Sequence, residues 1–180
     1  MKILIFSDSH GDTGTMCSVT EKEKPDMIIH LGDGMADAEL LQAKYPGIQM
    51  IKNLGNVDSD KEEELIKHKE ICGKRIVMTH GHTFYHYTFN SETGSNELTD
   101  ETRVTGRRDI LKYMQENNTD IFLHGHTHEP YINIAQASGK TCWIMNPGRS
   151  GRMEGTAIKP TYGILKIYES GALEWKIAEA

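Results

Sequence analysis

Two histidines in the tetrapeptide Gly125-His126-Thr127-His128 are the side chains of this sequence best suited to chemistry. They directly follow the apolar residues 121–123, and this pattern predicts a buried strand that ends at a tight turn. Neutral imidazole is the commonest metal-binding side chain in proteins. The pair therefore indicates either a metal site beyond the strand end or two histidines that are hydrogen-bonded to the backbone.

Four other predicted strands also end in side chains that can bind a metal. In an open α/β sheet such turns converge on one crevice beyond the carboxyl ends of the strands. The donors are carboxylates, an amide and imidazoles without thiolate, a set that suits Mn²⁺, Fe²⁺, Zn²⁺ or Ni²⁺. They outnumber the ligands of one ion, so the pattern favours two ions about 3.5–4 Å apart that share a carboxylate. The residues concerned are Asp8, His10, Asp33, Asn56 and His80.

Composition excludes several classes of protein. The 180 residues predict a single domain, and no apolar run approaches the roughly 20 residues that cross a bilayer. Residues 1–6 predict a first strand and not a secretory signal. The net charge is −6 and the longest basic cluster is Arg107-Arg108, which argues against an extended nucleic-acid surface but not against binding of a single phosphate. The three cysteines are widely spaced and odd in number, which indicates a reducing compartment and hence the cytoplasm.

The order of apolar runs and polar turns indicates an α/β protein. Strands and helices alternate in the first part, which predicts parallel pairing, with elements at 2–6, 13–24, 27–31, 37–44 and 48–51. The second part is expected to be antiparallel, with a helix at 102–115 and strands at 65–71, 75–79, 120–123, 131–135, 141–145, 162–168 and 173–178. Together they predict two packed sheets flanked by helices. The polar connection 82–102 is long enough to be a functional lid or a disordered insertion.

The motifs also resemble those of a known family. Asp-x-His, Gly-Asp, Gly-Asn-x-Asp, Thr-His-Gly-His and Gly-His-Thr-His occur here in the order found in calcineurin-like metallophosphoesterases. The short length and the turn Asn146-Pro147-Gly148 look like the small bacterial and archaeal phosphodiesterases of the YfcE type, over residues 1 to about 168. The resemblance implies a four-layer α-β-β-α sandwich of two packed mixed sheets in one domain, 1–180, with an inserted loop or cap at about 84–103.

The resemblance further implies a dinuclear phosphodiesterase that acts on a small phosphodiester. A hydroxide bridging two divalent transition-metal ions, Mn²⁺ in the first place and otherwise Ni²⁺, Fe²⁺ or Zn²⁺, would attack phosphorus in line. No nucleic-acid or membrane partner is expected, and a homo-oligomer is compatible with the sequence. The first ion would be held by Asp8, His10 and His128, and the second by Asn56, His80 and His126, with Asp33 bridging both.

Two positions depart from the family pattern. Many members carry a histidine directly after Gly-Asn, where this chain has Val57, so protonation of the leaving group is left to water or to His82. Arg149 follows the Asn-Pro-Gly turn where related proteins have serine, and it is either a phosphate ligand beside Asn56 or a solvated turn residue. We expect Asp58 to serve catalysis by orienting a ligand or the Asn56 turn, without binding a metal directly.

Two other functions compete with this interpretation. A non-catalytic interaction module, like the small retromer subunit, shares the fold but has lost key histidines that this chain retains. A hydrolase of the metallo-β-lactamase type requires His-x-His-x-Asp-His, whereas Glu129-Pro130 follows His128 here. Two further histidines, His30 and His124, lie inside or beside predicted strands, and we expect them to be structural.

Overall fold

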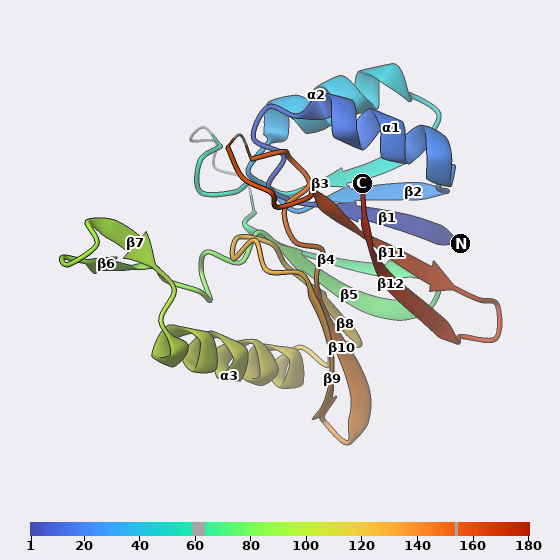
Figure 1. The fold of residues 1–180 in the computed structure, drawn as a ribbon. Helices are drawn as coiled ribbons and strands as arrows, with labels where there is room; N and C mark the ends of the chain where they lie inside the picture. Colours follow the sequence, from blue (N-terminus) through green and yellow to red (C-terminus); the bar gives the residue numbers. More distant parts are fainter. Residues whose placement is uncertain (59–63, 154) are drawn as a thin grey trace.

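Two five-stranded sheets form the centre of the computed structural model, which describes residues 1–58, 64–153 and 155–180 (Figure 1). The first sheet has the order β12-β11-β1-β2-β3, in which β1, β2 and β3 are parallel and β11 and β12 are antiparallel to their neighbours. Its strands are β1 (Lys2–Phe6), β2 (Met27–His30), β3 (Gln49–Lys52), β11 (Thr161–Ile167) and β12 (Leu173–Glu179).

The second sheet has the order β4-β5-β8-β10-β9. Its central strand β8 is parallel to both β5 and β10, whereas the edge strands β4 and β9 pair with their neighbours in antiparallel hairpins. The strands are β4 (Ile66–Ile71), β5 (Lys74–Thr79), β8 (Ile121–Leu123), β9 (Tyr131–Ala137) and β10 (Lys140–Asn146).

Alternation along the strands divides the apolar side chains into three buried layers. Along β1, Ile3 and Ile5 face the second sheet, where they meet Met78 and Leu123 in the central core. The intervening Leu4 and Phe6 face the helices α1 (Thr13–Glu23) and α2 (Met35–Lys44). On the far side, the second sheet packs against α3 (Asp100–Glu116). The α/β class and the four-layer α-β-β-α arrangement are therefore confirmed.

The expectation of an antiparallel second part was wrong for β8. The helix α3 connects β5 to β8, and a strand-helix-strand crossover places its two strands parallel. The strands β11 and β12 also do not extend the second sheet, because β11 pairs with β1 of the first. The three expected hairpins, β4–β5, β9–β10 and β11–β12, are antiparallel.

The polar connection between β5 and α3 carries a small hairpin of its own. Its strands are β6 (Thr88–Asn90) and β7 (Ser95–Glu97), and Figure 1 shows it projecting beyond the start of α3, away from both sheets. An inserted loop or cap was expected at this place in the chain, where the structure has this hairpin. Among the described helices, none combines the length and the apolar character that a membrane crossing requires.

Candidate metal centre

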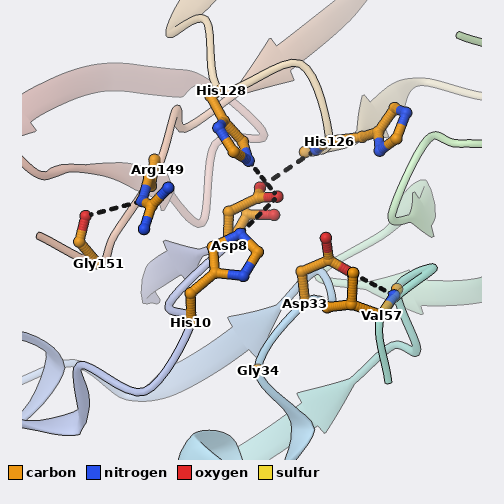
Figure 2. A network of polar contacts seen from close by, with 12 residues as sticks. Asp8, His10, Asp33, Gly34, Val57, His126, His128, Arg149 and Gly151 are labelled. Carbon is orange, nitrogen blue, oxygen red and sulfur yellow. Dashed lines mark hydrogen bonds and ion pairs between the residues drawn. The ribbon is translucent and has the colours of Figure 1, made fainter. Parts of the chain in front are cut away.

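All seven predicted ligands meet where loops from both sheets converge. The loops after β1 and β2 are joined by the hydrogen bond from Asp8 N–H to Gly32 O, at 2.9 Å. The loops after β5 and β8 are joined by that from Gly125 N–H to His80 O, at 2.8 Å. Figure 2 shows Asp8, His10, Asp33 and His128 close together, with the backbone of His126 beside Asp8. The turn of the Gly-His-Thr-His motif thus reaches the carboxylates of the other sheet.

One group of donors surrounds the carboxylate of Asp8. Its Oδ1 atom lies 3.1 Å from Nε2 of His128 and 4.0 Å from Nε2 of His10. This oxygen is completely buried, and no described residue makes a hydrogen bond to it with acceptable geometry. A buried carboxylate oxygen without a hydrogen bond, facing imidazole nitrogens, is suited to a cation. Asp8, His10 and His128 can therefore hold a metal ion together.

A second group of donors surrounds His80. Its Nε2 atom lies 3.1 Å from Oδ1 of Asn56, 3.2 Å from Nδ1 of His126 and 3.3 Å from Oδ2 of Asp33. Ligand atoms that share one ion at bond lengths of about 2.0–2.2 Å lie about 3–3.6 Å apart, so each of these separations from His80 fits a shared ion. The Asp and His side chains at this place whose ligand atoms all lie within 4.8 Å of one another are Asp8, Asp33 and His80. The Nε2 atom of His80 is 3.9 Å from Oδ1 of Asp8, which places the two groups of donors side by side.

The backbone at the site is unusual. Nine described residues other than glycine have a positive φ, and five of them are predicted ligands. Such conformations cost energy for a residue with a Cβ atom, and they persist where the surrounding structure imposes them. Four of the five occur in pairs separated by one residue, 8 with 10 and 126 with 128. The five ligands are Asp8, His10, Asp33, His126 and His128, with φ between 43° and 67°.

The charges of the site favour a cation. Burial alone would raise the pKa of Asp33. The contact with His80 and the charge of His80 outweigh this effect and lower the pKa to about 2. The pKa of Asp8 is also lowered, because His128 and His80 outweigh its burial. Burial and the nearby His80 lower the pKa of His126 to about 4. At neutral pH both carboxylates are thus ionised and His126 is neutral, which are the forms that bind metals.

Asp58 holds two ligand loops together. Its Oδ2 atom accepts the backbone N–H groups of Asp33 and Gly55, both at 2.8 Å. Its Oδ1 atom accepts those of Gly34 and Met35, at 3.0 and 2.9 Å, where α2 begins. With both oxygens occupied in this way, Asp58 positions the loops of Asp33 and Asn56. Its expected part in catalysis stays a prediction.

Asp37 holds the loop after β1, which carries Asp8 and His10, in the way that Asp58 holds the other two loops. The sequence did not point to Asp37. Its Oδ2 atom accepts the Ser9 hydroxyl and the Gly11 N–H, both at 2.7 Å, between which His10 lies. The other side of Ser9 is contacted by His30, whose Nε2 atom lies 3.2 Å from Ser9 Oγ. His30 is completely buried, which fits the structural role expected for it.

The Gly125–His128 turn is held by residues that follow in the chain. The side-chain amide of Asn146 donates to Gly125 O and Thr127 Oγ1, both at 2.9 Å. A Cβ atom on Gly125 would lie 1.8 Å from Ser7 Oγ, so only glycine allows this approach of the two sheets. His124 is buried and contacts the Tyr131 hydroxyl at 2.6 Å, again as expected of a structural residue. Neither Asn146 nor Tyr131 was predicted to support the turn.

The two residues predicted to contact substrate lie in different places. His82 is partly buried and lines a cavity of about 480 Å³ over the centre, with its ring centroid 5.6 Å from that of His80. Arg149 lines a separate cavity of about 1330 Å³, which has His10 in common with the first. Its guanidinium donates to Gly151 O at 3.1 Å (Figure 2). It also donates to Arg152 O at 3.3 Å. The side chain of Val57 is exposed, and its N–H donates to Asp33 Oδ1.

With this geometry in place, comparison with known proteins identifies the family. Residues 1–170 match the model of the calcineurin-like phosphoesterase superfamily domain. The chain belongs to the calcineurin-like phosphoesterase superfamily. No curated protein sequence matches it significantly. The family uses divalent metals, which agrees with the two groups of Asp and His side chains that could hold an ion, Asp8-His10-His128 and Asp8-Asp33-His80.

Solved structures share the calcineurin-like phosphoesterase fold at low sequence identity. A predicted phosphoesterase from Streptococcus pneumoniae is 22% identical, with a TM-score of 0.63, and the match covers 99% of this chain and 97% of that one. YfcE, a phosphoesterase from E. coli, is 21% identical, with a TM-score of 0.58 and coverages of 92% and 88%. Vps29 from Entamoeba histolytica, complexed with Zn²⁺, is 16% identical, with a TM-score of 0.62 and coverages of 99% each.

Proposed function

We propose that this chain is a dinuclear metal-dependent phosphodiesterase acting on a small phosphodiester. The observation that carries the proposal is the pair of adjoining donor groups, one around Asp8 Oδ1 and one around His80 Nε2, only 3.9 Å apart. Asp8, His10 and His128 would hold one ion, Asn56, His80 and His126 the other, and Asp33 both. Ions in such a pair supply Lewis acidity toward the phosphoryl oxygens and lower the pKa of a bound water.

The residues of the chain would prepare these ligands before substrate arrives. The Nδ1–H group of His80 faces Leu31 O at 3.1 Å, and this hydrogen bond directs Nε2 toward Asn56, Asp33 and His126. The N–H of His126 donates to Asp8 Oδ2 at 3.1 Å, which ties the Gly-His-Thr-His turn to the first loop. Preorganised ligands of this kind need no rearrangement when charge develops on the phosphate.

The surroundings support a small ester. The cavity of about 480 Å³ above the donors has the size of a small-molecule site. The net charge of −6, without a long basic cluster, does not favour a nucleic-acid surface. His82 would approach the leaving oxygen from the wall of this cavity. The oxygen and nitrogen donor set makes Mn²⁺ our first candidate, with Ni²⁺, Fe²⁺ and Zn²⁺ as alternatives.

Hydrolysis of bis-p-nitrophenyl phosphate tests the proposal. The protein is first stripped with a chelator and then reconstituted with each of the four ions. We expect turnover that depends on added metal, and slower release of nitrophenol from the monoester p-nitrophenyl phosphate. A folded protein that binds two ions but hydrolyses neither ester would contradict catalysis. It would instead favour a metal-binding interaction module of the same fold, of which Vps29 is the structural relative.

A further inference from the structure

The inserted segment between β5 and α3 provides one wall of the cavity over the metal centre. Four of its residues line that cavity: Tyr85, His86 and Tyr87, which precede β6, and Asn96 of β7. An inserted loop or cap was expected here, and its role was left open. Because the inserted segment contributes so many lining residues, it can distinguish between substrates that share the same phosphate chemistry.

The base of this wall is fixed to the rest of the molecule. Tyr85 is 2% exposed, and its ring occupies the space beside Gly106 of α3, where a Cβ atom would lie 2.5 Å from Tyr85 Cδ1. Its hydroxyl lies 3.3 Å from that of Tyr131. At the other end of the insertion, Arg103 forms an ion pair with Glu129, directly after His128. The wall is thus attached to α3 and to the ligand turn itself.

Tyr87 is the residue of the wall nearest to a proposed ligand. Its ring meets that of His126 edge to face, with centroids 5.0 Å apart and planes at 83°. Its hydroxyl donates to His126 O at 3.3 Å, which fixes the orientation of the ring. The side chain is still 39% exposed. An aromatic surface that is held in place and open to the cavity can stack against a flat group.

The chemical character of the wall indicates which kind of substrate group could bind against it. Among the described residues that line this cavity there is no lysine or arginine, so nothing here favours a second phosphate. The wall offers aromatic rings and the amide of Asn96, which can both donate and accept hydrogen bonds. A planar, uncharged ring with polar edges, such as a nucleobase, matches both features. An aliphatic ester substituent would neither stack on the aromatic rings nor form hydrogen bonds with the amide of Asn96.

We propose that this inserted wall makes the enzyme selective for nucleoside-containing phosphodiesters, with the base stacked on Tyr87. The inference rests on the proposed phosphodiesterase function and names its substrate class. It assigns Tyr87 as a specificity-determining residue that acts on the ester substituent and not on the phosphate.

Two esters with the same leaving group test this assignment. They are thymidine 5′-monophosphate p-nitrophenyl ester and methyl p-nitrophenyl phosphate, which differ in the group that stays on the phosphate. We expect the metal-reconstituted wild type to prefer the thymidine ester by about tenfold or more in kcat/KM, as stacking on one aromatic side chain provides. Tyr87→Ala should reduce this preference about tenfold, and Tyr87→Phe should retain it.

Phe89→Ala is the matched control. Phe89 is an aromatic residue of the same inserted segment, two positions after Tyr87, is 65% exposed and is not among the residues that line the cavity, so its loss should leave the preference unchanged. A wild-type preference near one, or a preference that survives Tyr87→Ala, would overturn the inference while the phosphodiesterase function stands. Absence of turnover of both esters by the folded, metal-loaded wild type would overturn both proposals.

Discussion

Asp58 Oδ2 accepts the backbone N–H of Asp33 at 2.8 Å, although Asp33 lies 25 residues earlier in the chain. The same oxygen accepts the N–H of Gly55, next to Asn56. One carboxylate therefore holds together the loops of Asp33, the proposed bridging ligand, and Asn56, a proposed ligand of the second ion. Its effect on catalysis should pass through metal binding.

Asp58→Asn tests this positioning role. Asparagine is nearly isosteric, but its amide nitrogen cannot accept, so two of the four backbone N–H groups lose their partner. We expect the affinity for the second ion to fall about 10- to 100-fold while the protein remains folded. Calorimetric metal titration and circular dichroism measure the two effects. Asp109→Asn, on the exposed face of α3, is the control. Unchanged metal affinity would show that the loops hold their positions without Asp58.

Asn56→Ala should remove one ion selectively. The amide oxygen lies 3.1 Å from His80 Nε2 and contributes to the second donor group only. We expect elemental analysis to find one ion per chain in place of two, and hydrolysis of bis-p-nitrophenyl phosphate to fall on the order of a hundredfold or more. Asn133→Ala, on the exposed edge strand β9, should retain two ions. Two tightly held ions in Asn56→Ala would refute the assignment.

The sequence indicated the location of the site because its motifs are local. Each ligand follows an apolar strand within a few residues, and the carboxyl ends of such strands meet at one edge of the fold. His30 and His124 could likewise be set apart from the ligands, since they lie within or beside the apolar runs themselves. The order of the strands in the sheets was harder to predict from the sequence. That β8 is parallel to both neighbours depends on α3 crossing over between β5 and β8, which no local pattern encodes.

Supporting residues were missed for a related reason. Asp37 contacts Ser9 28 residues away, and Asn146 contacts Gly125 21 residues away, and neither has a motif that links it to its partner. The left-handed conformation of Asp33 is imposed in the same manner by distant contacts, such as that of its N–H with Asp58. Side chains that could do chemistry are thus visible in the sequence, whereas the groups that orient them require the fold.

His82→Ala should affect substrates according to their leaving group. His82 lines the cavity over the proposed metal centre. Val57, which stands where many family members carry a histidine, has no polar side chain to take this part. If His82 donates a hydrogen bond to the leaving oxygen, its loss should slow the hydrolysis of methyl phenyl phosphate on the order of 10- to 100-fold. The effect should be much smaller with bis-p-nitrophenyl phosphate, whose leaving group needs less stabilisation. His68→Ala, which is exposed beside Tyr113, serves as control. Equal losses on both esters would exclude this role.

The buried His30 should make the metal-free protein less stable in acid. Burial lowers its pKa from 6.5 to about 4, despite the nearby Asp8, Asp58 and Asp37. Below pH 6.5 the unfolded chain therefore takes up a proton that the folded protein does not. The stabilisation from the neutral ring is complete above pH 6.5 and is lost as the pH falls toward 4, by about 3 kcal/mol in total.

His30→Gln isolates this contribution, because glutamine can hydrogen-bond to Ser9 but does not titrate. Urea unfolding in the presence of a chelator, at pH 7 and pH 5, measures the free energy of unfolding of both proteins. Between these two values the wild type should lose about 2 kcal/mol more than the variant. The comparison cancels the titration of the carboxylates, which both proteins share. If the two proteins lost equal stability, the ring would have to bind its proton in the folded state, contrary to its complete burial.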